Sequence, residues 1–102
     1  MSIHIDESTG ESAGESLYLS CRVLGAKNLN PSITYQWIKN NSSGQIKVGT
    51  HAILSFTPVR LSDAASYSCA VTIASVYLTN NITAMASHSV RIQSRLINSR
   101  QL

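Results

Sequence analysis

Residues 54–69 read LSFTPVRLSDAASYSC, and this stretch decides the fold of the 102-residue chain. Leu54 and Phe56 alternate with polar neighbours, which is typical of a strand that turns one face toward a core. Pro58 then ends the regular ladder, because proline cannot donate a ladder hydrogen bond. The last three residues begin another alternating segment, so the stretch predicts two core strands with an irregular segment between them.

Period-two alternation recurs on both sides of this stretch, whereas helical periodicity is poor throughout. Residues 40–44 (NNSSG) are a strong turn signal, and a short strand is predicted after them at 45–48. Many short strands with turns between them predict an all-β, two-sheet sandwich. Ile3 and Ile5 indicate a first edge strand. The residues predicted to face the core are Leu17, Leu19, Cys21, Val23, Ile33, Tyr35, Trp37, Leu54, Phe56, Tyr67, Cys69, Val71, Ile73, Val90 and Ile92.

Two cysteines flank the single tryptophan, in the order Cys21, Trp37, Cys69. Tyr67 stands two residues before the second cysteine, and Asp63 stands four residues before that tyrosine. With this combination the chain resembles the immunoglobulin superfamily over most of its length. The resemblance implies a disulfide between the cysteines that pins two sheets together, with the tryptophan packed on it. It also implies that the tyrosine hydroxyl reaches back to the backbone a few residues upstream.

The spacing of these residues narrows the subtype. The cysteines are 48 residues apart (69 − 21), which is short for a variable-type domain, and one short strand fits between Trp37 and Leu54. We therefore expect a C2- or I-type sandwich with strands A, B and E in one sheet and G, F, C and C-prime in the other, strand D being vestigial. Residues 1–94 are the expected domain, and 95–102 are expected to be a polar tail or linker stub.

One departure from the family pattern concerns Asp63. Its usual arginine partner is missing, since no arginine lies between Arg22 and Arg60. Its partner is expected to be a lysine such as Lys47, a backbone donor, or none.

Charge is sparse and unevenly distributed. Charged residues make up 13% of the chain, and the net charge is +3. Four of the five acidic residues lie in the first fifteen positions, whereas eight Lys and Arg follow, which is too dilute a bias to predict nucleic-acid binding. Arg91, Arg95 and Arg100 are the densest basic run. They could bind a sulfated glycan or an acidic protein, although scattered basic residues more commonly keep a surface soluble.

Residues that could carry catalysis or bind a metal are not grouped. His4, His51 and His88 are scattered, and the chain has neither a phosphate-binding glycine-rich loop nor a Cys-x-x-Cys pair. The sequence therefore predicts a protein that is not an enzyme and has no cofactor or metal site.

Three asparagines begin glycosylation sequons at predicted turns: Asn40, Asn41 and Asn81. Asn40 and Asn41 are adjacent, so we expect a glycan on only one of them. The sequence lacks a secretory signal and a membrane-spanning apolar run. If the domain is extracellular, those segments belong to a membrane-anchored parent and are missing from this fragment.

The resemblance implies that the chain is an extracellular module of a multidomain cell-surface receptor. The parent is expected to be a receptor tyrosine kinase or an adhesion protein, and the module binds a protein ligand or homophilic partner or acts as a spacer. Alternatives are an intracellular structural I-type domain and an innate immune receptor domain. The paired cysteines disfavour the intracellular alternative, because disulfides persist in oxidising compartments.

The segment between Ile73 and Met85 is unusual, because apolar residues interrupt it where the family commonly has a short turn. We expect the two flanking strands to run on and meet at a two-residue turn, Asn80-Asn81. Such a hairpin would place Val71 opposite Val90 and Cys69 opposite Ile92. It would display an apolar group for a partner or for self-association: Val76, Tyr77, Leu78 and Ile82. The alternative is a loop that folds back over the core.

Overall fold

A computed structural model describes residues 2–8 and 13–92. This part of the chain forms seven β-strands, two short 3₁₀ turns and no α-helix. The strands are β1 (Ser2–Ser8), β2 (Leu17–Leu24), β3 (Ser32–Asn41), β4 (Gly44–Gly49), β5 (Ile53–Phe56), β6 (Ala65–Ala74) and β7 (Ile82–Val90). The 3₁₀ turns are η1 (Lys27–Leu29) and η2 (Leu61–Asp63).

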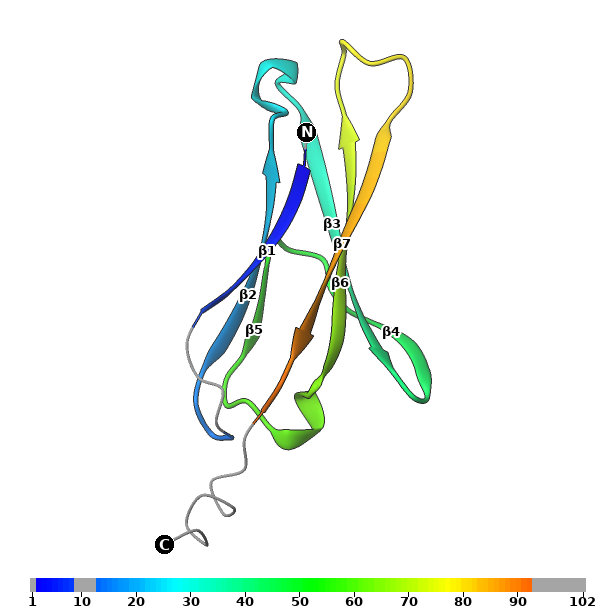
Figure 1. The fold of residues 1–102 in the computed structure, drawn as a ribbon. Helices are drawn as coiled ribbons and strands as arrows, with labels where there is room; N and C mark the ends of the chain where they lie inside the picture. Colours follow the sequence, from blue (N-terminus) through cyan, green and yellow to red (C-terminus); the bar gives the residue numbers. More distant parts are fainter. Residues whose placement is uncertain (1, 9–12, 93–102) are drawn as a thin grey trace, which may run out of the picture.

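The strands form two antiparallel sheets that face one another (Figure 1). One sheet has the order β1-β2-β5 and the other has the order β4-β3-β6-β7. These are the predicted A-B-E and C-prime-C-F-G sheets, so the expected immunoglobulin-like sandwich is confirmed. Residues 50–52, between β4 and β5, form no strand, as expected where strand D is vestigial.

The core lies between the sheets and is built from alternate residues of their strands. In β2 and β6, buried side chains alternate with more exposed ones, because successive residues of a strand point to opposite faces. The buried apolar cluster comprises Leu17, Leu19, Cys21, Trp37, Val59, Tyr67, Cys69, Val71, Ile73 and Val90. Leu54 and Phe56 are half-buried and pack against it. The strand faces are therefore those that the alternation predicts.

Particular residues mark the end of β5 and the turn between β3 and β4. β5 ends at Phe56, just before the cis Thr57–Pro58 peptide bond. Between β3 and β4, Gly44 has a φ of 123°, a conformation that glycine adopts without a steric penalty. In the same turn the backbone N–H of Ser43 donates to Oδ1 of Asn41 at 2.9 Å.

The predicted register of the last two strands is wrong. Val71 lies opposite Ala84 and not Val90, and Cys69 lies opposite Ala86 and not Ile92. The strands do not meet at Asn80-Asn81, because β6 ends at Ala74 and β7 begins at Ile82. A seven-residue loop at 75–81, here the β6–β7 loop, joins them.

Two hydrogen-bonded contacts favour the observed register. Ser68, which is buried on the outer face of β6, makes a hydroxyl–hydroxyl hydrogen bond of 2.8 Å with Ser87 of β7. The Ser68 oxygen also accepts a hydrogen bond from Asn40, and Ser87 provides an acceptor for its O–H, which would be costly to bury without one. Ser75, which opens the loop, is bonded to a neighbouring loop and takes no part in a longer strand. The difference in register does not alter which face of each strand is buried, since Val71 and Val90 both point into the core as predicted.

Candidate functional site

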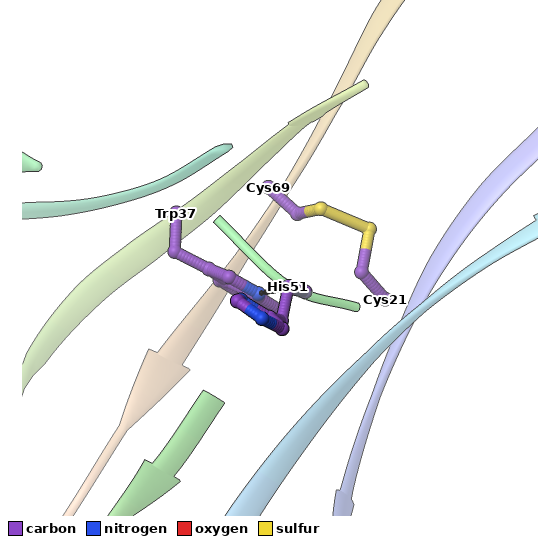
Figure 2. Close-up of a disulfide and its surroundings, with 4 residues drawn as sticks. All are labelled: Cys21, Trp37, His51 and Cys69. Atoms are coloured by element: carbon purple, nitrogen blue, oxygen red, sulfur yellow. Dashed lines mark hydrogen bonds between the residues drawn. A yellow bond between two sulfur atoms is a disulfide. The ribbon is translucent and has the colours of Figure 1, made fainter. Parts of the chain in front are cut away.

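The centre of the sandwich holds the disulfide that the resemblance implied. Cys21 of β2 and Cys69 of β6 are bonded, with their Cα atoms 6.4 Å apart, so the bond joins the two sheets. Trp37 lies beside it and is fully buried (Figure 2). Its indole Nε1 donates a hydrogen bond of 2.8 Å to the backbone oxygen of His51. This satisfies the one polar atom of the buried ring.

A second structural group lies at the end where β5 passes into β6. The Tyr67 hydroxyl donates to the backbone oxygen of Asp63, and the Phe56 ring packs edge-on against Tyr67 with centroids 5.3 Å apart. Burial raises the pKa of Tyr67 to about 12, and the negative charge of Asp63 adds to the effect. The Asp63 carboxylate accepts the backbone N–H of Arg60 at 2.8 Å. Of the three alternatives for this aspartate, the structure shows the backbone donor.

The histidines take part in separate pairs. His88 of β7 contacts the Glu7 carboxylate of β1 at 2.8 Å, which links the edges of the two sheets. His4 bonds the Ser2 hydroxyl at 3.1 Å, and His51 lies 3.4 Å from the hydroxyl of Thr50. Within residues 2–8 and 13–92, no three His, Cys, Asp or Glu side chains gather where they could hold a metal ion.

The β6–β7 loop lies at one end of the sandwich, beside the loop between β2 and β3 (Figure 1). Ser75 organises it through three hydrogen bonds. Its hydroxyl donates to the backbone oxygen of Leu29 in η1 and accepts the N–H of Tyr77 at 3.2 Å. Its backbone oxygen accepts the N–H of Leu78 at 3.1 Å. The loop is therefore tied to its neighbour and does not fold back over the core.

The loop exposes two of the four apolar residues predicted to be displayed. Val76 is 91% exposed and Tyr77 is 72% exposed. Leu78 is half-buried, and Ile82 begins β7 and packs against the core. Beside the exposed pair lies a shallow hollow lined by Asn30, Ser32, Ala74, Ser75, Val76 and Asn81.

The surroundings of the exposed pair are nearly neutral. Residues 25–31 and 75–81, which make up the two neighbouring loops, contain one charged side chain, Lys27. An apolar pair with few charges around it is suited to contact with another protein surface, because little charge must be desolvated.

The three sequon asparagines differ in their surroundings. Asn40 is half-buried, and its Nδ2 donates to the Ser68 hydroxyl at 3.1 Å. Asn41 is exposed at the end of β3, and Asn81 is exposed just before β7.

Two of the three residues of the predicted basic run, Arg95 and Arg100, lie outside the described residues, as does the predicted tail at 95–102. The third, Arg91, is exposed directly after β7. The described part of the chain has no helix of the length and apolarity needed to cross a membrane.

Known proteins give two points of comparison. A family model described as an immunoglobulin domain matches residues 2–72, a range that includes both bonded cysteines and Trp37. A solved structure of murine CRIg has a similar fold, with a TM-score of 0.61 and 15% sequence identity, covering 88% of this chain and 98% of that chain. No curated protein sequence matches the chain.

Proposed function

Because the chain belongs to the immunoglobulin domain family, we propose that it is a C2- or I-type recognition module of a multidomain cell-surface protein. The parent is a receptor tyrosine kinase or an adhesion protein, and the module binds a protein partner through the β6–β7 loop. Its two-sheet topology, with no strand between β4 and β5, supports the C2 or I type.

The Cys21–Cys69 disulfide supports an extracellular location. Disulfides persist in oxidising compartments such as the cell surface, whereas cytosolic thiols are kept reduced. Exposed Asn41 and Asn81 are proposed as the glycosylation sites of such a protein, because surface turns are accessible to glycans.

The observation that carries the proposal is the exposure of Val76 and Tyr77 in a loop that is held in place by hydrogen bonds. Tyrosine is enriched among the residues that dominate binding energy, since its ring offers a large contact area with few rotatable bonds. The hydrogen bonds of Ser75 hold the backbone that carries this pair. A partner therefore has less loop entropy to remove on binding.

The proposal is tested with the domain made in a secretory host and joined into a tetramer, which compensates for weak single contacts through avidity. Binding of the tetramer to panels of human and animal cell lines is measured by flow cytometry. The tested variant is Val76→Ser/Tyr77→Ser. The matched control is Ile46→Ser on β4, because Ile46 is an exposed apolar residue, at 54%, on a different part of the surface.

We expect cells stained by the unchanged domain to lose staining with the loop variant and to keep it with the control. Protease treatment of the cells should also remove staining. Equal staining by the loop variant and the unchanged domain would overturn the proposed site. Loss of staining after heparinase would instead show that a sulfated glycan is the ligand.

A further inference from the structure

The outer strand β7 is a sheet edge with unusual properties. The orders β1-β2-β5 and β4-β3-β6-β7 leave four edge strands: β1, β5, β4 and β7. An edge strand has a row of backbone N–H and C=O groups without ladder partners, which another strand can pair with. Proteins commonly prevent this pairing with charges, short strands, proline or irregular register.

Three of the four edges carry such protection. β1 contains the adjacent acids Asp6 and Glu7. β5 is four residues long, and Pro58 follows it closely. β4 carries Lys47, and its pairing with β3 shifts register between Trp37 and Ile38.

β7 lacks all of these features. It is nine residues long and reads ITAMASHSV, without Lys, Arg, Asp, Glu, Pro or Gly. Its pairing with β6 is regular along its whole length. Among the described residues its ladder partner is β6 alone. β1 of the other sheet also lies close to this edge, and its Glu7 contacts His88 of β7.

We propose that the β7 edge pairs with the β7 edge of a second copy of this chain, antiparallel and about a two-fold axis. A second copy fits because two identical strands related by such an axis offer the same groups to each other. Because β7 has no formally charged residue other than a titratable histidine, no like charges of Lys, Arg, Asp or Glu meet across the axis.

The alternation of faces limits this pairing to registers in which outer-face residues oppose one another, and pairing over the full strand selects one of them. Thr83, Met85, Ser87 and Ser89 are exposed on the outer face, while the even-numbered residues are more buried. Directly opposed residues must share a face. Pairing over the full strand then places Ala86 on the two-fold axis, Met85 opposite Ser87 of the second copy, and Thr83 opposite Ser89.

The paired state would be one continuous sheet across both copies. Since the strands run antiparallel, the two β6–β7 loops would lie at opposite ends of it, and the exposed Tyr77 of each copy would remain free. Self-pairing through β7 and partner binding through the loop are therefore separate properties of the domain.

The test is sedimentation equilibrium of the 102-residue chain over a wide concentration range. The apparent mass should rise from the 11.0 kDa of the monomer toward twice that value. Met85→Lys and Met85→Glu should each weaken association roughly tenfold, because the two like charges lie diagonally across the axis within reach of each other. An equimolar mixture of the two variants should restore association, and high salt should partly rescue each variant alone.

Matched controls are Ile46→Lys and Ile46→Glu, which place the same charges on the opposite edge of the same sheet, and Tyr77→Ser in the loop. All three should associate like the unchanged domain. Thr83→Lys is the second β7 variant should a Met85 variant lose its thermal unfolding transition, because in this register the added charge lies diagonally opposite Arg91 of the second copy. The proposal is overturned by a monomer at every concentration, or by association that Ile46 or Tyr77 substitutions abolish and β7 substitutions leave intact.

Discussion

The Ser75 hydroxyl donates a hydrogen bond to the backbone oxygen of Leu29, joining two loops that are 46 residues apart in sequence. The same hydroxyl accepts the N–H of Tyr77. One side chain thus ties the β6–β7 loop to η1 and orders the backbone of the exposed pair. The proposed link between loop order and partner binding therefore depends on this residue.

Replacing Ser75 by Ala should loosen the loop. We expect the free energy of unfolding to fall by about 1 kcal/mol, the net value of a typical hydrogen bond. Amide exchange should accelerate at Tyr77, whose N–H loses its acceptor, and hydrogen-exchange mass spectrometry or NMR measures it. The control is Ser55→Ala, because Ser55 is exposed on β5. Equal exchange at Tyr77 in both variants would contradict this role.

Replacing both Cys21 and Cys69 by Ala should destabilise the domain by about 2–5 kcal/mol, the usual cost of removing a disulfide from a small secreted domain. The bond closes a segment with a sequence separation of 48, and it joins the two sheets directly. Denaturant unfolding of the oxidised protein and of the variant measures the difference. An unchanged midpoint would show that the core alone holds the sheets together.

The fold could be predicted largely from the sequence, because alternation reports which side of a strand is buried. Leu17, Leu19 and Cys21 are buried as their spacing predicts. The disulfide pair could be named from its setting with Trp37 and Tyr67, a combination specific to one fold.

The register of β6 and β7 could not be predicted in the same way. Moving one strand by an even number of residues keeps every side chain on its original face. The pairing of Val71 with Ala84 therefore satisfies the apolar pattern as well as the predicted pairing with Val90 does. What distinguishes them is contact detail, such as the Ser68–Ser87 hydrogen bond, which apolar spacing does not encode.

The exposed residues of the β6–β7 loop were predicted in part. Apolar residues in a segment of unexpected length pointed to Val76 and Tyr77, which are exposed, but also to Leu78 and Ile82, which are half-buried. The tie between Ser75 and Leu29 was missed. A serine carries no sequence signal of a distant backbone acceptor, since that contact depends on how two loops meet in space.

Tyr67 should make stability depend on pH in the alkaline range. Its pKa is raised from 10.0 to about 12 in the folded protein. Its contribution is therefore complete below pH 10 and is lost as the pH rises through about 12, because the unfolded chain then binds fewer protons than the folded one. Tyr67→Phe should lower stability by about 1 kcal/mol at neutral pH and flatten this alkaline loss.

Tyr67→Ala provides the comparison. It should cost about 3 kcal/mol or more, because the buried ring and its edge-on contact with Phe56 are also removed. Urea unfolding at several pH values measures both variants. Equal destabilisation of the Phe and Ala variants would contradict this expectation. Removing the ring would then cost nothing beyond the loss of the hydroxyl bond to Asp63.

Of the overlapping sequons at Asn40 and Asn41, we expect a glycan on Asn41. Asn41 is exposed, whereas Asn40 is half-buried with its Nδ2 on the Ser68 hydroxyl. Asn41→Gln leaves the Asn40 sequon intact and should lose one glycan from the mass of the secreted protein. Asn40→Gln leaves the Asn41 sequon intact and should keep that glycan. Mass spectrometry before and after enzymatic deglycosylation distinguishes them, and retention of the glycan in Asn41→Gln would assign it to Asn40 instead.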